Sequence, residues 1–502
     1  MGAALSRDRR SGVLLHVSSL PGPYGIGDLG PSAREFAAWL ASAKQRIWQV
    51  LPLTVVDPHG CPYASPTAFA REPAYLSPDD LAEDGFVTHR DKPYLAGDLV
   101  DWAAIRASRA PFLQKAATAI AEEVALDAWR AENPWVENWA LFAALVDLHG
   151  PDWTAWPRDL RDLHATPAKR RTVEADLAAP IARHAALQWA FDRQWRRLRT
   201  VAKSHGIALW GDLPFFVGPL SADVWAHRAL FDLDADGHPK TITGVPPDAF
   251  SPTGQLWHHP HFVRSAHAAE GWRWWVDRAA AALELVDVLR LDHFRGLDGV
   301  WEVPATDDTA ENGQWIEGPG QEALDALTAH LARQPGGGGA LPLIAEDLGV
   351  ITEPVRKLRD DAALPGMAIL QFAFGTGSTH EFLPHHHRHA QVVYTGTHDN
   401  DTVAGWFRTA SPETRQHALA YLHTDERDLV WAMIRATWRS VADTAIVPMQ
   451  DLLSLGSDAR MNVPGVVAGN WRWRLGREAL NLSLARRLAE QTILSGRAGG
   501  TE

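Results

Sequence analysis

The chain of 502 residues has a single cysteine, Cys61, and no long apolar run. One cysteine cannot form an intramolecular disulfide, and it excludes a zinc site built from several thiolates. No window approaches the roughly 18 apolar residues that a membrane-spanning helix needs. The opening residues, MGAALSRDRRSG, also lack the apolar stretch of a signal peptide. We therefore expect a soluble cytoplasmic protein with no membrane partner.

Basic residues are fewer than acidic residues. The chain has 48 Lys and Arg against 61 Asp and Glu, which gives a net charge of −13. Because an acidic chain repels phosphate backbones, we expect no nucleic-acid partner. Hydrophobic residues make up 46% and charged residues 22% of the chain, as in an ordinary globular protein. This composition excludes disorder over most of the length.

Tryptophan, in contrast, is abundant, with 23 residues. Large aromatic side chains contribute much of the burial energy of a core, so a structural role is the simpler interpretation. Sugar binding is the sharper alternative, because the flat C–H faces of pyranose rings pack on indoles. Composition alone favours the core.

Eight short apolar runs have the length of strands, and stretches of helical character lie between most of them. This alternation predicts an α/β fold, a parallel (β/α)₈ TIM barrel. The runs are Gly12–His16, Trp48–Pro52, Ile207–Asp212, Val286–Asp292, Leu343–Asp347, Met367–Gln371, Val392–Gly396 and Ala445–Met449.

The spacing between the runs is uneven and predicts two insertions. Residues 54–206 form a mainly helical one, in which apolar residues recur at helical spacing over 187–201. Residues 214–270 form a loop-rich one that lines the active-site cleft. The catalytic barrel then comprises residues 1–53 and 207–502.

Polar residues stand at the ends of four runs. They are Asp212, Asp292, Glu346 and, just past its run, Asp399. The active sites of such barrels lie at the carboxyl ends of the strands. An Asp can also cap the next helix, which could explain one or two of these residues. Four on separate strands favour a site.

Two of these carboxylates suit complementary roles. Arg290 and Asp292 are two apart on a strand and so face the same side, where the arginine lowers the pKa of the carboxyl, as a nucleophile needs. Glu346 ends an apolar strand, where desolvation raises its pKa, as a general acid needs. Asp347 points the other way and is expected to be structural.

A nucleophile and an acid about 5–5.5 Å apart are the requirement of retaining glycoside chemistry. Sequence spacing cannot show this distance. On the residues alone, metal-assisted and other carboxylate chemistry remain open.

Three segments resemble parts of metal sites, but none has a full set of ligands. Asp232–Gly237 starts like a calcium loop, but Thr243 stands at the twelfth position, where a bidentate Glu is needed. The histidine clusters 258–261 and 385–389 lack a helical HExxH arrangement, and we expect surface histidines. We predict no metal ligands.

An ordered series of motifs runs along nearly the whole chain. It comprises Gly12–His16, Ser19–Gly30, Trp48–Leu53, Gly211–Pro214, Gly244–Ser251, Gly254–Trp257, the three carboxylate motifs and Arg460–Gly465. This series resembles the 4-α-glucanotransferases, also called amylomaltases or disproportionating enzymes.

The resemblance implies a barrel that moves α-1,4-glucan segments from a maltooligosaccharide, starch or glycogen-type glucan to the 4-OH of another glucose or glucan. The reaction would retain the anomeric configuration and need no cofactor or metal. Asp292 would be the nucleophile, Glu346 the acid/base, and Asp399 the carboxylate that stabilises the transition state. The implied substrate contacts are Tyr63, Asp212, Phe250, Trp257, Arg290, His293, His398 and Asn462.

The chain departs from the family pattern at Cys61, Glu72, Ala249 and His259, which bears on the outer subsites. Ala249 replaces a Tyr in the segment Gly244–Trp257, which we expect to exclude water from the intermediate. An α-glucan hydrolase and an inactive carbohydrate-binding barrel are the alternative functions. The intact carboxylates argue against the inactive barrel.

Overall fold

The computed structural model describes residues 9–247, 251–334 and 339–499. Eight parallel strands form one sheet in the order β10-β11-β12-β1-β2-β3-β6-β9. Each coincides with one of the eight apolar runs, so the predicted (β/α)₈ barrel is confirmed. The strands are β1 (Arg10–Leu14), β2 (Ile47–Gln49), β3 (Ala208–Leu213), β6 (Val288–Leu291), β9 (Leu343–Ala345), β10 (Gly366–Ile369), β11 (Gln391–Tyr394) and β12 (Thr444–Pro448).

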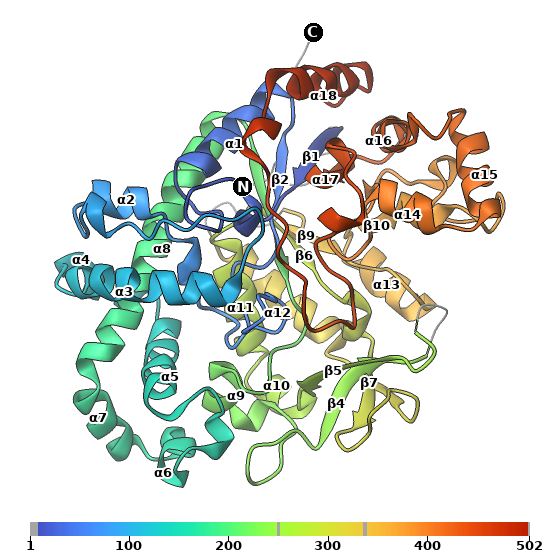
Figure 1. Ribbon diagram of the computed structural model, residues 1–502. Coiled ribbons are helices and arrows are strands. Elements are labelled where there is room, and N and C mark those ends of the chain that lie inside the picture. The colour runs from blue at the N-terminus through green and yellow to red at the C-terminus, as the bar shows by residue number, and fades with distance from the viewer. Residues whose placement is uncertain (1–8, 248–250, 335–338, 500–502) are drawn as a thin grey trace.

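The barrel closes between the two ends of this sheet. The N–H of Ala345, at the end of β9, donates to the carbonyl of Pro365, just before β10, over 2.9 Å. Figure 1 shows β1, β2, β6 and β9 at the centre of the molecule, with helices around them. Closure brings the carboxyl ends of all eight strands to one end of the barrel.

Helices surround most of the barrel. Between β10 and β11 the chain instead forms only short 3₁₀ turns, at Leu370–Ala373 and Pro384–His386. No helix of the described residues has the length and apolar character to cross a bilayer. The helices outside the segments 54–206 and 214–270 are α1 (Pro31–Ser42), α11 (Arg273–Leu283), α12 (Gly320–Ala332), α13 (Glu353–Asp361), α14 (Val403–Thr409), α15 (Pro412–Leu422), α16 (Leu429–Arg439), α17 (Met449–Leu452) and α18 (Leu482–Leu494).

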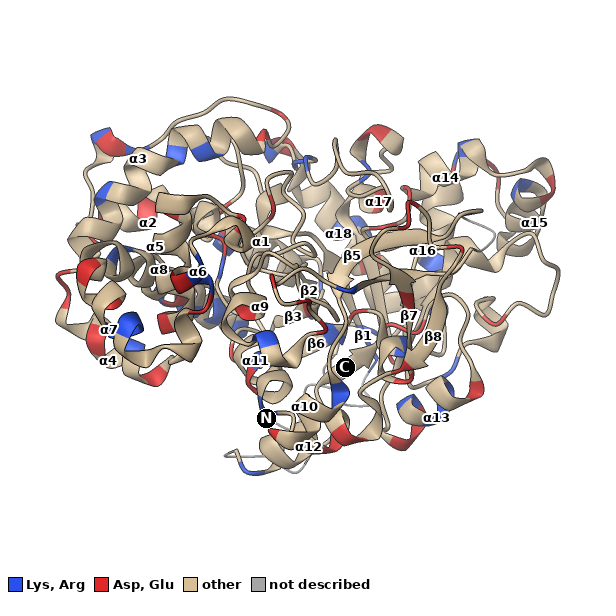
Figure 2. Cartoon of the chain, turned by 90° about the horizontal axis from the view of Figure 1, so that it is seen from below, with Lys and Arg blue, Asp and Glu red and all other residues tan. Residues whose placement is uncertain are grey.

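The long segment between β2 and β3 is mainly helical. Its longest helix, α8 (Ala178–Ser204), contains the predicted helix 187–201 and ends just before Gly206, whose φ of +69° breaks the helix. Acidic and basic residues are intermixed on the outer helices of this segment (Figure 2). The shorter helices are α2 (Pro78–Glu83), α3 (Trp102–Ile120), α4 (Val124–Glu132), α5 (Trp135–His149), α6 (Arg158–Arg161) and α7 (Pro167–Asp176).

A second sheet, which the sequence analysis did not predict, is antiparallel and has the order β5-β4-β7-β8. Two of its strands, with α9 (Ala222–Ala226) and α10 (Arg264–Ala269), lie in the segment 214–270, which is therefore less loop-rich than expected. The other two follow β6. The strands are β4 (Thr241–Val245), β5 (Gln255–Pro260), β7 (Gly299–Pro304) and β8 (Gln314–Glu317).

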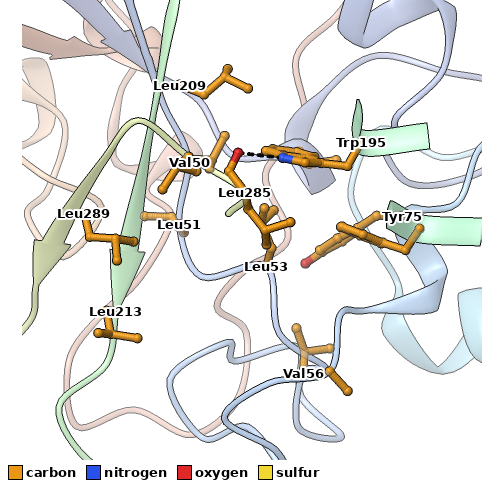
Figure 3. Close-up of a cluster of buried hydrophobic side chains, with 14 of the residues drawn as sticks. Val50, Leu51, Leu53, Val56, Tyr75, Trp195, Leu209, Leu213, Leu285 and Leu289 are labelled. Atoms are coloured by element: carbon orange, nitrogen blue, oxygen red, sulfur yellow. Dashed lines mark hydrogen bonds between the residues drawn. The ribbon is translucent and has the colours of Figure 1, made fainter. Parts of the chain in front are cut away.

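The core joins the barrel wall to α8. The indole N–H of Trp195 on α8 donates to the carbonyl of Leu285, 2.7 Å away, beside apolar side chains of the barrel wall (Figure 3). Trp195 and Leu209 are each 1% exposed. Most of the other tryptophans are buried as well, so the core interpretation holds for the majority of them.

Candidate active site

Strand register brings the predicted polar residues together. Asp212 on β3 pairs directly with Arg290 on β6. Asp292 and Glu346 each follow immediately after the last paired residues of β6 and β9. Neighbouring strands lie about 4.8 Å apart, so Asp292 and Glu346 lie side by side at the carboxyl end of the barrel.

One arginine links two of the acids. Arg290 Nη1 lies 2.7 Å from Asp212 Oδ2 and 2.9 Å from Asp292 Oδ1. The side chain of Asp212 is fully buried, whereas that of Asp292 is 27% exposed. Burial raises the pKa of Asp212 to about 7, although Arg290 opposes the shift. Asp292 is therefore the arginine-paired acid that a ligand can reach.

Glu346 is held by the backbone. Its Oε2 accepts a hydrogen bond from the N–H of His293 over 2.8 Å, and its Oε1 accepts one from the N–H of Leu348 over 3.0 Å. Burial, with the like charge of Asp292, raises the pKa of Glu346 to about 8, although Arg290 opposes the shift. This carboxyl is therefore mostly protonated at neutral pH, as a general acid must be.

The backbone of His293, which donates one of the two hydrogen bonds to Glu346, has an unusual conformation. The residue has φ 48° and ψ 50°, the left-handed conformation that few non-glycine residues adopt. His293 directly follows the candidate nucleophile Asp292, and its N–H donates to Glu346. Such a conformation persists only where the surroundings impose it, and it is frequent in active sites.

Asp399 follows β11 and is held by a distant segment. Asn462 Nδ2 donates to Asp399 Oδ1 over 2.6 Å, and Arg460 Nη2 donates to the Asp399 carbonyl over 2.6 Å. His398 Nε2 lies 3.4 Å from Asp399 Oδ2. The His398 ring stacks on Tyr63, with centroids 5.2 Å apart, and the Tyr63 hydroxyl donates to Asp212 Oδ2 over 3.0 Å. This chain of contacts connects Asp399 to the other acids.

The comparisons with known proteins identify the family. The model of a family described as 4-alpha-glucanotransferase matches residues 15–479. The chain belongs to the 4-α-glucanotransferase family. It is 43% identical to the 4-alpha-glucanotransferase of Thermus thermophilus over 483 residues, which are 93% of this chain and 95% of the relative. It is 41% identical to that of Synechocystis over 504 residues, 97% and 98% of the two chains.

A solved structure agrees over the whole length. The amylomaltase from Streptococcus agalactiae, in complex with acarbose, superposes with a TM-score of 0.92 at 33% identity. The match covers 98% of this chain and 100% of the other. The protein is thus an enzyme, a transferase that acts on α-1,4-glucans, as its resemblance implied.

Aromatic rings of this glucanotransferase border the carboxyl groups. Trp257 meets His293 edge-on, with ring centroids 4.7 Å apart. Phe216 lies 6.1 Å from each of those two rings. The ring of Trp471 lies 5.8 Å from that of Tyr63. Phe250, the remaining predicted contact, is outside the described residues.

Three neighbours of the site were missed by the sequence analysis. They are Phe216, Trp471 and His16, whose Nδ1 accepts from the N–H of Leu51 and whose Nε2 lies 3.0 Å from the Tyr75 hydroxyl. His16 ends the first apolar run, as Asp212 ends its own run, so the same signal could have found it. Phe216 and Trp471 carry no signal beyond being aromatic.

Two small cavities border the site. One, of about 40 Å³, is lined by Tyr63, Asp212 and Phe216 among others. The other, of about 20 Å³, is lined by His16 and His398 among others. Each is large enough for water. The Oδ1 of Asp212 is buried without a hydrogen-bond partner among the described residues, and a water in the first cavity would satisfy it.

The structure shows what the residues of these metal-like segments contact. Asp234 Oδ1 accepts from the N–H groups of Asp236, Gly237 and His238 over 2.8–2.9 Å, which makes a tight turn. Two of the clustered histidines are buried rather than at the surface. His261 is 2% exposed, and His387 bridges Ser440 Oγ and the Phe382 carbonyl. Among the described residues, no three His, Cys, Asp or Glu gather as metal ligands would. The expectation of no metal remains a prediction.

Proposed function

We propose that this glucanotransferase works by double displacement, with Asp292 as nucleophile and Glu346 as acid/base. The observation that carries the proposal is the pair itself. Asp292 is held by Arg290 over 2.9 Å, and next to it Glu346 accepts two backbone hydrogen bonds and has a pKa of about 8. An ionised nucleophile beside a protonated acid is the starting state of a retaining mechanism.

In the first step, an Asp292 carboxylate oxygen attacks C1 of a glucose unit. The C1–O bond to the leaving chain breaks, and Glu346 gives its proton to that oxygen. The product is a covalent glucosyl ester on Asp292. Positive charge builds on the sugar in the transition state, where Asp399, fixed by Asn462, would stabilise it.

In the second step, Glu346 acts as a base. The ester on Asp292 carries no charge, which removes the like charge that helps to raise the pKa of Glu346. The lowered pKa favours the carboxylate, which takes the proton from an acceptor 4-OH. The acceptor oxygen then attacks C1 and displaces Asp292, so the α-1,4 linkage is retained.

The remaining predicted residues serve binding in this proposal. Tyr63, Trp257, His293, His398 and Asn462 would contact the sugars near the reacting bond. Asp212 is different, because its side chain is fully buried. We assign it to positioning Arg290, and through Arg290 the nucleophile, instead of a direct sugar contact.

We propose that the substrates are maltooligosaccharides, starch and glycogen-type glucans. We also propose that the enzyme needs no cofactor and is cytoplasmic. The division of the chain is likewise a proposal. The catalytic barrel would comprise residues 1–53 and 207–502, with insertions at 54–206 and 214–270. Adding EDTA during the assay tests the absence of a metal.

The assignment of the two acids is tested by substitution. Asp292→Asn should lower turnover of maltotriose by several orders of magnitude, because nucleophilic attack is removed. Glu346→Gln should lose turnover of maltotriose yet still form the covalent intermediate from a glycosyl fluoride, whose leaving group needs no proton. Mass spectrometry of the quenched enzyme detects the ester. Near-normal turnover by Asp292→Asn would disprove the nucleophile.

A further inference from the structure

Trp315 is the one exposed tryptophan of the protein. All 23 tryptophans lie among the described residues, and this side chain, 43% exposed, is the only one that solvent reaches to such an extent. It lies on β8, the edge strand of the antiparallel sheet. A single exposed apolar residue is common on protein surfaces, so a binding role for this ring has to follow from how it is held and where it lies.

Two neighbours hold the Trp315 ring in place. The guanidinium carbon of Arg295 lies 3.8 Å from the ring centroid. Trp301, the direct partner of Trp315 across β7 and β8, meets it at 64° with centroids 5.1 Å apart. Arg295 Nη1 is in turn fixed by the carbonyl of Val350 over 2.7 Å. A ring ordered in advance loses little entropy when a ligand stacks on it.

The charge of Arg295 has no direct carboxylate partner. Within the described ranges the guanidinium forms no salt bridge, and its polar contact is the Val350 carbonyl. A guanidinium against an exposed indole combines N–H donors with a flat apolar surface. A glucose unit offers the complement, because it has a flat C–H face and a rim of hydroxyl groups.

The backbone places this pair at the active end of the barrel. Arg295 lies three residues after Asp292, in the turn Phe294–Leu297 that follows β6, and three residues span at most about 11 Å. The N–H of Gly318, just after β8, donates to the carbonyl of Asp298 over 2.9 Å and so ties the edge strand to this turn.

The same turn begins at the residue that holds the acid/base. His293 donates its N–H to Glu346, the group proposed to protonate the leaving oxygen. In the proposed mechanism the leaving chain departs and the acceptor chain enters next to Glu346, and the turn begins beside that carboxyl.

We infer that Trp315 and Arg295 form a glucan-binding site outside the reaction centre, which holds distal glucose units of a long acceptor or leaving chain. The inference rests on the proposed function, since the acid/base assignment defines where the acceptor chain enters. Glucose as acceptor is too short to occupy both places, so the site would give long acceptors a lower KM. If Arg295 only covers an edge strand, its removal lowers stability and leaves the dependence of KM on acceptor length unchanged.

The kinetic test compares short and long acceptors. With an α-maltosyl fluoride donor, Trp315→Ala should raise the KM for maltoheptaose about tenfold, the equivalent of about 1.4 kcal/mol, and leave kcat and the KM for glucose unchanged. Trp315→Phe, which keeps a ring, should restore part of the loss. Equal effects on both acceptors, or none, would overturn the inference, even if Trp315→Ala also lowers Tm.

A binding test separates this inference from the proposed function. Calorimetry measures the Kd for maltoheptaose in an Asp292→Asn background, with and without Trp315→Ala. The matched control is Tyr94→Ala, which removes a ring that is 65% exposed elsewhere. Trp315→Ala should weaken binding about tenfold and the control should not. No change in Trp315→Ala, or an equal loss in both, would overturn the site. Turnover of maltoheptaose by Asp292→Asn itself would instead disprove the nucleophile.

Discussion

At the scale of single residues, the protonation of Glu346 controls the first chemical step. Its pKa of about 8 means that the acid form predominates below that pH and is lost above it. With maltotriose as donor, kcat/KM should therefore fall as the pH rises through about 8. Measuring kcat/KM from pH 5 to pH 10 tests for this fall, which is the alkaline limb of the pH profile.

The control for this pH dependence uses the same enzyme with another donor. A glycosyl fluoride needs no proton on its leaving group, so the formation of the intermediate should lose the fall near pH 8. An unchanged limb with the fluoride donor would show that a group other than the general acid titrates there.

Tyr63 has two separable contacts in the site. Its hydroxyl donates to Asp212 Oδ2 over 3.0 Å, and its ring stacks on His398 at 5.2 Å. Tyr63→Phe removes only the first contact and should lower kcat about tenfold, equivalent to about 1.4 kcal/mol of activation free energy, because Asp212 then positions Arg290 and the nucleophile less firmly. Tyr63→Ala removes both and should also raise the KM for maltotriose. Identical kinetics in the two variants would contradict this division.

The carboxyl groups of the site could be predicted because they break apolar runs at strand ends. The direct contact of Arg290 with Asp292 followed from their spacing of two on a strand. The left-handed backbone of His293 could not be predicted, because nothing in its residue type requires φ 48°. Its conformation depends on surroundings that only the folded chain assembles, including the acceptor Glu346.

At the scale of elements, Arg497 joins the end of the chain to the barrel. Its side chain donates to five backbone carbonyls over 2.7–3.1 Å, at the end of α16 and around the starts of β1 and β12: those of Trp438, Ser440, Ala442, Asp443 and Arg10. Three of these carbonyls have a second donor, because Arg9 donates to those of Trp438 and Ser440 and the N–H of Arg10 donates to that of Asp443. The arginine thus holds three elements together at the barrel end opposite the active site.

Arg497→Lys should therefore lower the free energy of unfolding by about 2–4 kcal/mol, because an ammonium has at most three N–H donors for five acceptors. Urea unfolding measures the change, and turnover at 25 °C should not change. The matched control is Arg486→Lys on the exposed face of α18, which should leave the unfolding midpoint within error. Equal loss in the two variants would show that the carbonyl contacts of Arg497 contribute little.

The eight barrel strands could be predicted because a parallel strand covered on both sides is a short, continuous apolar run. The antiparallel sheet could not. Its strands are polar or mixed, as Thr241–Val245 and Gln255–Pro260 show, and the pairing of β4 with β5 is interrupted near His258, whose φ is +60°. The interruption hides the alternation of period two that a half-buried strand normally has. The glycines and prolines around it made the segment resemble a loop.

At the scale of the whole molecule, the insertions decide what reaches the intermediate. The segment from β4 to β5 brings Trp257 to 4.7 Å from His293, and Phe216 packs against both rings. Trp471 lies beside Tyr63, with ring centroids 5.8 Å apart. A glucose ring can stack on such aromatic rings and displace water from them.

The intermediate on Asp292 can react with a sugar hydroxyl or with water. Transfer prevails only if the acceptor is held in the attacking position while water is kept out. We expect dominant transfer with a measurable hydrolytic leak, because Ala249, in the segment between β4 and β5 but outside the described residues, replaces the Tyr of the family pattern. With maltotriose, transfer releases glucose without raising total reducing ends, whereas hydrolysis raises both. The ratio of new reducing ends to glucose released should therefore be low but not zero, and Ala249→Tyr should lower it further. A ratio near one in the native enzyme would make it a hydrolase, and an unchanged ratio in Ala249→Tyr would contradict only the role of that position.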